Sequence, residues 1–165
     1  FSPIMDEVLN FAEKGGIVLG ICNGFQILLE AGLLPGAMQQ NKSLKFVCKD
    51  TYLKVTNKNT PFTNKIDKDP LKIPIRHGEG NYFADTQTVA ELEKNNQIVF
   101  RYASKEGKVD NAFNPNGSIS NIAGIINKNQ NVLGLMPHPE NACDPVLRNT
   151  DGQFIFRSIA ESLFN

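Results

Sequence analysis

The first thirty residues combine amphipathic segments with one wholly apolar segment. Apolar side chains recur at helical spacing over residues 4–12, and Ser2-Pro3 before them supplies an N-cap and a first-turn proline. Gly15-Gly16 ends this predicted helix, and the apolar run 17–21 that follows is typical of a buried parallel strand. A second helix is predicted over residues 24–30. This helix–strand–helix order predicts an α/β sheet with helices on its faces.

The rest of the chain has β-like patterns in its middle and a helical pattern at its end. We predict strands over 46–55 and 97–102, a hairpin formed by 122–126 and 132–136, and a closing amphipathic helix over 151–164. Residues 57–69 are polar, rich in lysine and interrupted by Pro61 and Pro70, so we expect a surface loop or an excursion at a sheet edge. Asn-Pro-Asn-Gly-Ser at 114–118 predicts a turn, because proline restricts φ and glycine permits φ > 0.

Length, charge and cysteine content restrict the class of protein. The 165 residues suit one domain, and 17 basic against 17 acidic residues give no net charge, which argues against a dedicated nucleic-acid binder. No run of eighteen apolar residues is present, so we expect no membrane span. The chain has three cysteines, Cys22, Cys48 and Cys143, an odd number without CxxC spacing. This favours a reducing cytoplasm over a disulfide framework. The chain starts at Phe1, almost directly in a helical pattern, so we expect that a longer protein has lost its beginning.

One cysteine stands where the apolar strand meets the second helix. Gly20-Ile21-Cys22-Asn23-Gly24 has the spacing of a nucleophile elbow, in which small neighbours allow a sharp, strained turn. The start of the helix would favour a thiolate at Cys22, and the N–H of Asn23 would be one oxyanion donor. The alternative is that Cys22 is a small buried apolar residue, as most free cysteines are. Cys48 and Cys143 have no such setting, and we interpret both as structural.

The chain has two histidines, and one of them is a candidate general base. His138 lies in Pro137-His138-Pro139-Glu140, directly after an apolar strand, and proline disfavours a helical backbone at the preceding residue. Side chains two apart on an extended chain face the same way, so Glu140 would orient the His138 ring and stabilise its imidazolium. The alternative is a surface histidine in a stiff loop. An elbow cysteine together with such a histidine favours catalysis.

The other histidine, His77, lies between charged residues and glycines. Arg76 and Glu79 would suit a ligand that carries both a carboxylate and an ammonium group, such as an amino acid, but a polar hairpin turn explains the same string. The two histidines and three cysteines are scattered without ligand pairs, so we expect no metal site.

Several strings together resemble a known family. Gly-Ile-Cys-Asn-Gly-Phe-Gln at 20–26 and Met-Pro-His-Pro-Glu at 136–140 are similar to class I, triad-type glutamine amidotransferases. His-Gly-Glu-Gly-Asn-Tyr at 77–82 and Asn-Pro-Asn-Gly-Ser at 114–118 resemble, more narrowly, the small glutaminase subunits of phosphoribosylformylglycinamidine synthase, which serve de novo purine biosynthesis. Phe-Arg-Tyr at 100–102, Asn-Ile-Ala-Gly-Ile at 121–125 and Thr-Asp-Gly at 150–152 add to this resemblance.

The resemblance implies a fold and a set of site residues. It implies a flavodoxin-like α/β fold, a mixed and mostly parallel sheet flanked by helices, with the elbow at the carboxyl end of a central strand. Residues 1–165 would form one glutamine amidotransferase domain without the family's N-terminal strands, whose Pro-Gly-Gly loop supplies a second oxyanion donor. The implied catalytic residues are Cys22, His138 and Glu140. The implied substrate-binding residues are Asn23, Gly24, Gln26, His77 and Gly78.

The resemblance also implies partners and a reaction. Glutamine would be hydrolysed here, and its ammonia would pass to a large synthase subunit that uses ATP and Mg²⁺, with a small accessory subunit in the same complex. No cofactor would bind this chain itself. Two alternatives remain open: a free-standing γ-glutamyl hydrolase of the same fold, and a non-enzymatic fragment that only docks on the synthase.

Overall fold

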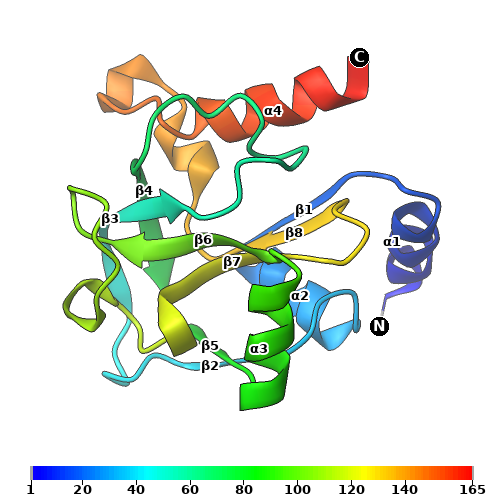
Figure 1. Ribbon diagram of the computed structural model, residues 1–165, viewed down its shortest axis with the longest axis horizontal. Helices are drawn as coiled ribbons and strands as arrows, with labels where there is room; N and C mark the ends of the chain where they lie inside the picture. The colour runs from blue at the N-terminus through cyan, green and yellow to red at the C-terminus, as the bar shows by residue number, and fades with distance from the viewer. Residues whose placement is uncertain (1, 165) are drawn as a thin grey trace.

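The computed structural model describes residues 2–164, which form two β-sheets with helices packed around them (Figure 1). The α-helices are α1 (Pro3–Glu13), α2 (Asn23–Glu30), α3 (Thr86–Lys94) and α4 (Gln153–Phe164). The strands are β1 (Val18–Ile21), β2 (Ala37–Gln40), β3 (Val47–Val55), β4 (Leu71–His77), β5 (Glu79–Phe83), β6 (Ile98–Ala103), β7 (Ile122–Ile126) and β8 (Val132–Leu135). Short 3₁₀ turns lie at η1 (Asn111–Phe113), η2 (Ile119–Asn121), η3 (Pro139–Ala142) and η4 (Pro145–Leu147).

The larger sheet has six strands in the order β1-β8-β7-β6-β3-β4. An α/β fold with a mixed sheet flanked by helices is therefore confirmed, and β1, predicted as a parallel strand, is parallel to β8. The expectation of a mostly parallel sheet is wrong for residues 2–164, because the other four strand pairs of this sheet are antiparallel. For one of these pairs the connection explains the difference: β7 and β8 are joined by residues 127–131, which is too few for the crossover that parallel neighbours need.

The smaller sheet pairs β2 with β5 in antiparallel fashion. Strand β4 belongs to the larger sheet and β5 to the smaller one, so the chain passes from one sheet to the other at Gly78. The hairpin-turn interpretation of the string around His77 is therefore wrong, because β4 pairs with β3 and β5 with β2. The sequence patterns also missed β2, β4, β5 and α3.

Apolar side chains form a core on each face of the larger sheet. Strand β8 shows the alternation expected of a strand: Leu133 and Leu135 pack in the core beneath α4, whereas Val132 packs on the opposite face with Phe25 of α2 and Leu92 of α3. Figure 1 shows α4 on one side of this sheet and α2 and α3 on the other. In the part of the chain described, no helix is long and apolar enough to cross a membrane.

The three predicted helices start within two residues of α1, α2 and α4. Helix α1 begins at Pro3 as expected, but the side chain of Ser2 makes no capping hydrogen bond. In α3, by contrast, the Asp85 side chain accepts a hydrogen bond from the backbone N–H of Thr88.

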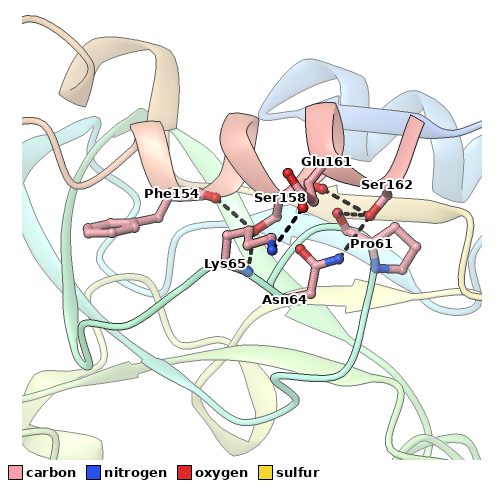
Figure 2. A network of polar contacts seen from close by, with 7 residues as sticks. All are labelled: Pro61, Asn64, Lys65, Phe154, Ser158, Glu161 and Ser162. Atoms are coloured by element: carbon pink, nitrogen blue, oxygen red, sulfur yellow. Dashed lines mark hydrogen bonds and ion pairs between the residues drawn. The ribbon is translucent and has the colours of Figure 1, made fainter. Parts of the chain in front are cut away.

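The C-terminal helix α4 is attached to the loop over 57–69 by side-chain hydrogen bonds (Figure 2). The buried hydroxyl of Ser158 accepts from the backbone N–H of Lys65 at 3.0 Å and donates to the carbonyl of Phe154 at 2.8 Å. Ser162, one turn later, accepts from the side chain of Asn64. The loop has no helix or strand, as predicted, but these bonds hold it firmly against α4.

Candidate active site

Cys22 lies at the junction of β1 and α2, in a strained backbone conformation. Its φ of 52° and ψ of −105° are unusual for a residue with a side chain and cost on the order of 1–3 kcal/mol. A Cβ on Gly20 would lie 2.7 Å from the carbonyl group of Gly24, so the chain folds back too closely for any side chain at residue 20. A Cβ on Gly24 would meet nothing within 4 Å. The prediction that both glycines are required by packing is therefore confirmed for Gly20 and wrong for Gly24.

Strand pairing brings the histidine segment to the cysteine. Ile21 pairs with Leu135 in the parallel β1–β8 pair, and the backbone N–H of Cys22 donates to the carbonyl of Leu135 at 2.8 Å. The two strands therefore end at the same edge, where ligands bind in open α/β sheets. His138 follows β8 by three residues, and its N–H donates to the carbonyl of Pro74 in β4 at 2.8 Å. Since β4 lies at the far end of the strand order, the sheet must curl to bring its last strand beside the elbow.

The side chains of His138 and Glu140 are in direct contact. The His138 Nδ1 and Glu140 Oε1 atoms are 2.6 Å apart, and Asn141 donates to the same carboxylate oxygen at 3.0 Å. The predicted contact is present, but the backbone that produces it is not extended as expected. Glu140 lies in the 3₁₀ turn η3, which begins at Pro139 and bends the carboxylate back toward the ring.

The charge state of His138 depends mainly on the Cys22 side chain. The thiol beside the ring and the Glu140 carboxylate raise the pKa of His138 to about 9, although burial of the ring opposes this rise. Glu140 occupies Nδ1, so Nε2 is the nitrogen left for the thiol. Nε2 is buried and makes no regular hydrogen bond with any residue from 2 to 164.

A cavity of about 470 Å³ opens over these residues. Its lining contains six of the eight predicted site residues: Cys22, Asn23, Gln26, His77, Gly78 and His138. Glu140 and Gly24 are outside this lining. Gln26 donates through Nε2 to the carbonyl of Glu79 at 2.8 Å, which leaves its side-chain oxygen as the acceptor for a ligand. Phe46 stands on the rim and is 69% exposed.

Comparison with known proteins identifies the family. Residues 2–160 match the family described as the CobB/CobQ-like glutamine amidotransferase domain. The chain belongs to this family.

Curated relatives and a solved structure agree with the family match. The subunit PurQ of phosphoribosylformylglycinamidine synthase from Moorella thermoacetica is 59% identical over 162 residues, which cover 98% of this chain and 69% of the relative. The same subunit from Chlorobium luteolum is 56% identical over 164 residues, which cover 71% of that relative. The PurLQS structure from Thermotoga maritima matches with a TM-score of 0.81 at 42% sequence identity. The match covers 97% of this chain and 68% of the matching chain in that structure. The resemblance to glutamine amidotransferases, and to these subunits in particular, is confirmed.

Sequence reasoning missed a buried asparagine that holds the pocket segment of this amidotransferase in place. Asn41 is fully buried, and its Nδ2 donates to the carbonyls of Lys45 and His77 at 2.8 Å each. Its Oδ1 accepts from the N–H of Gly80 at 3.0 Å, and its backbone N–H donates to Gly78. A Cβ on Gly80 would lie 2.1 Å from the His77 ring, so this glycine is required by close approach. No pattern around residue 41 points to this role, because it depends on segments far away in the sequence.

The other two thiols of the described residues lie in settings unlike that of Cys22. Cys48 is exposed, and the thiol of Cys143 donates to the carbonyl of Pro139 at 3.1 Å. Burial and the nearby Glu140 charge raise the pKa of Cys143, which keeps it a thiol. Within residues 2–164, no group of three or more His, Cys, Asp or Glu side chains could hold a metal ion.

Proposed function

We propose that the chain hydrolyses glutamine through Cys22, His138 and Glu140, with Cys22 as the nucleophile. The observation that supports this most directly is the arrangement at one sheet edge: a strained elbow thiol, an imidazole beside it, and a carboxylate 2.6 Å from the far ring nitrogen. Such an order of nucleophile, base and orienting acid is the geometry by which triads are recognised.

In the first half of the proposed reaction, the Cys22 thiolate attacks the side-chain amide carbon of glutamine. The Asn23 N–H, at the start of α2, donates to the oxygen that becomes negative. The C–N bond then breaks as the His138 imidazolium gives its proton to the nitrogen, so ammonia leaves and a γ-glutamyl thioester remains. Glu140 stabilises the imidazolium before this transfer.

In the second half, water replaces ammonia. Neutral His138 takes a proton from a water molecule while the oxygen of that water attacks the thioester carbon. The C–S bond breaks, glutamate leaves, and the thiolate–imidazolium pair is restored. Gln26, His77, Gly78 and Gly24 are the residues proposed to hold the substrate, with the free oxygen of Gln26 accepting from its ammonium group.

The ammonia is proposed to serve a synthase partner. The family relatives are named as subunits of phosphoribosylformylglycinamidine synthase, and one solved relative is a PurLQS structure. We infer that a large subunit covers the pocket rim near Phe46, accepts ammonia, and uses ATP and Mg²⁺, with a small accessory subunit in the same complex. No cofactor is assigned to this chain. Its three free thiols fit a reducing compartment, and we propose the cytoplasm.

A labelling experiment and a substitution test this proposal in the complete protein assembled with the synthase. A glutamine analogue that carries a chloroketone in place of the amide should label Cys22, spare Cys48 and Cys143, and be blocked by glutamine. Cys22→Ala should abolish glutamine-dependent synthesis and preserve ammonia-dependent synthesis. Labelling spread over all three cysteines, by peptide mass mapping, would contradict the assignment, and glutamine hydrolysis at full rate without the synthase would favour a free-standing hydrolase.

A further inference from the structure

Three buried polar side chains, of which one lines the pocket and two lie behind it, are joined by hydrogen bonds. Tyr102 of β6 is 0% exposed, Asn116 of the turn over 114–118 is 2% exposed, and His77 at the end of β4 is 4% exposed. The Asn116 Nδ2 is 3.1 Å from the His77 Nε2 and donates to the Tyr102 hydroxyl at 3.2 Å. The proposed mechanism gives no role to Asn116 or Tyr102.

The direction of these bonds follows from one unambiguous donor. The backbone N–H of Ser118 can only donate, and it bonds the Asn116 side-chain oxygen at 3.1 Å. The other end of that amide is therefore its NH₂ group, which has two hydrogens for two neighbours. The His77 Nε2 must accept one of them, so a neutral His77 has its proton on Nδ1.

Nothing at the other side of the ring favours this tautomer. The His77 Nδ1 is buried and has no hydrogen-bond partner among residues 2–164. A buried donor without an acceptor is unfavourable, so without Asn116 the other tautomer of this ring would be favoured. Asn116 is thus the group that decides where the His77 proton lies.

The neutral state of His77 is important because the two histidines share one pocket. Burial, and then the charge of His138, lower the pKa of His77 to about 4. A second positive charge at His77 would act in return on His138 and disfavour the imidazolium that the proposed mechanism needs. The other titratable or charged groups around the ring are Cys22, Tyr102, Arg76, Glu79 and, beyond His138, Glu140.

We infer that Asn116, supported by Tyr102, is a positioning residue that holds His77 as a neutral ring with its proton on Nδ1, so that positive charge in the pocket wall collects on His138. This inference rests on the proposed glutaminase function for its kinetic consequence. Its structural part, the tautomer and charge of His77, stands independently of it.

Nitrogen NMR of the histidine rings tests the structural part directly. His77→Asn removes one ring from a long-range proton–nitrogen spectrum of the complete protein and so identifies the His77 signals. The His77 ring should have its proton on Nδ1 and show no titration between pH 8 and pH 5. A proton on Nε2, or titration near pH 6.5, would overturn the inference whatever the enzyme does with glutamine.

Asn116→Asp tests the kinetic part with little change of shape. A carboxylate beside Nε2 favours a proton there, so His77 should become an imidazolium at neutral pH. Glutamine-dependent kcat/KM should then fall at least about tenfold, with its alkaline limb moved to lower pH, while ammonia-dependent synthesis is retained. Tyr102→Phe removes only the second acceptor and should preserve the His77 tautomer with a smaller kinetic loss.

A matched variant in the same turn separates this effect from a disturbed loop. Asn114 accepts from the N–H of Gly117 and donates to the carbonyl of Ser118 without touching His77. Asn114→Asp should therefore weaken the turn and leave the ring tautomer unchanged. A wild-type ring spectrum and wild-type kinetics in folded Asn116→Asp would refute the inference. The altered ring spectrum without a kinetic effect would refute only the role assigned to it in glutamine hydrolysis.

Discussion

Replacing Glu140 by glutamine removes the charge from the proposed triad and keeps the side-chain size. The carboxylate lies 2.6 Å from the His138 Nδ1, and its side chain is 45% exposed. A glutamine could still accept from Nδ1–H through its oxygen. Its NH₂ could also donate to Nδ1, and the ring proton would then lie on Nε2, where the thiol needs a free base.

The magnitude follows from the kind of bond that is lost. A hydrogen bond to a charged partner contributes about 1.5–3 kcal/mol and a neutral one about 0.5–1.5, so the change removes about 1–2 kcal/mol. Because 1.36 kcal/mol is a factor of ten, kcat should fall about 5- to 30-fold. A triad with a buried carboxylate loses about 10⁴-fold. The loss here is smaller because solvent screens Glu140 and because a cysteine depends less on its base than a serine does.

The assay is glutamine-dependent kcat and KM across pH, in the complete protein assembled with the synthase. The Glu140 carboxylate contributes to the raised pKa of His138, about 9, so its loss should move the alkaline limb of kcat/KM to lower pH. Ammonia-dependent synthesis reports on assembly, and Glu91→Gln makes the same chemical change on the exposed face of α3. A kcat within twofold of wild type, with an unmoved alkaline limb, would show that Glu140 does not orient His138.

Three further predictions concern stability. Gly20→Ala places a Cβ 2.7 Å from the Gly24 carbonyl and should lower the free energy of unfolding, measured in urea, by about 1–3 kcal/mol. Gly24→Ala places its Cβ in open space and should lower it by less, so equal losses would contradict the packing argument. The pKa of His77 is lowered from 6.5 in the unfolded chain to about 4 in the folded protein, so the unfolded state binds more protons between these pH values. The free energy of unfolding should therefore fall by up to about 3 kcal/mol as the pH is lowered from 6.5 toward 4. Unfolding measured across pH should show this dependence in the wild type and not in His77→Asn. Ser158→Ala leaves the Lys65 N–H without its acceptor and should lower the free energy of unfolding by about 1–3 kcal/mol. Ser162 is only half-buried, so Ser162→Ala should have a smaller effect, and the reverse order would refute this prediction.

The sequence by itself determined the local geometry of the two segments proposed to be catalytic, because local backbone rules govern both. Gly20 and Cys22 at a strand-to-helix junction restrict the turn whatever the rest of the chain does, and the structure has the strained turn they predict. Pro-His-Pro-Glu likewise predicted the contact between His138 and Glu140, although η3 rather than an extended chain produces it. The apolar runs of β1, β7 and β8 were equally local signals.

Only the tertiary structure decided which distant segments complete the site. The curl of the sheet brings β4, and with it His77, beside an elbow more than fifty residues earlier, and no local pattern specifies that pairing. The buried amides of Asn41 and Asn116 obtain their roles from partners 36 and 39 residues away in the sequence. Hydrogen bonding and burial between residues so far apart in the sequence depend on the whole fold. Asparagines in the sequence alone therefore indicate only turns and polar linkers.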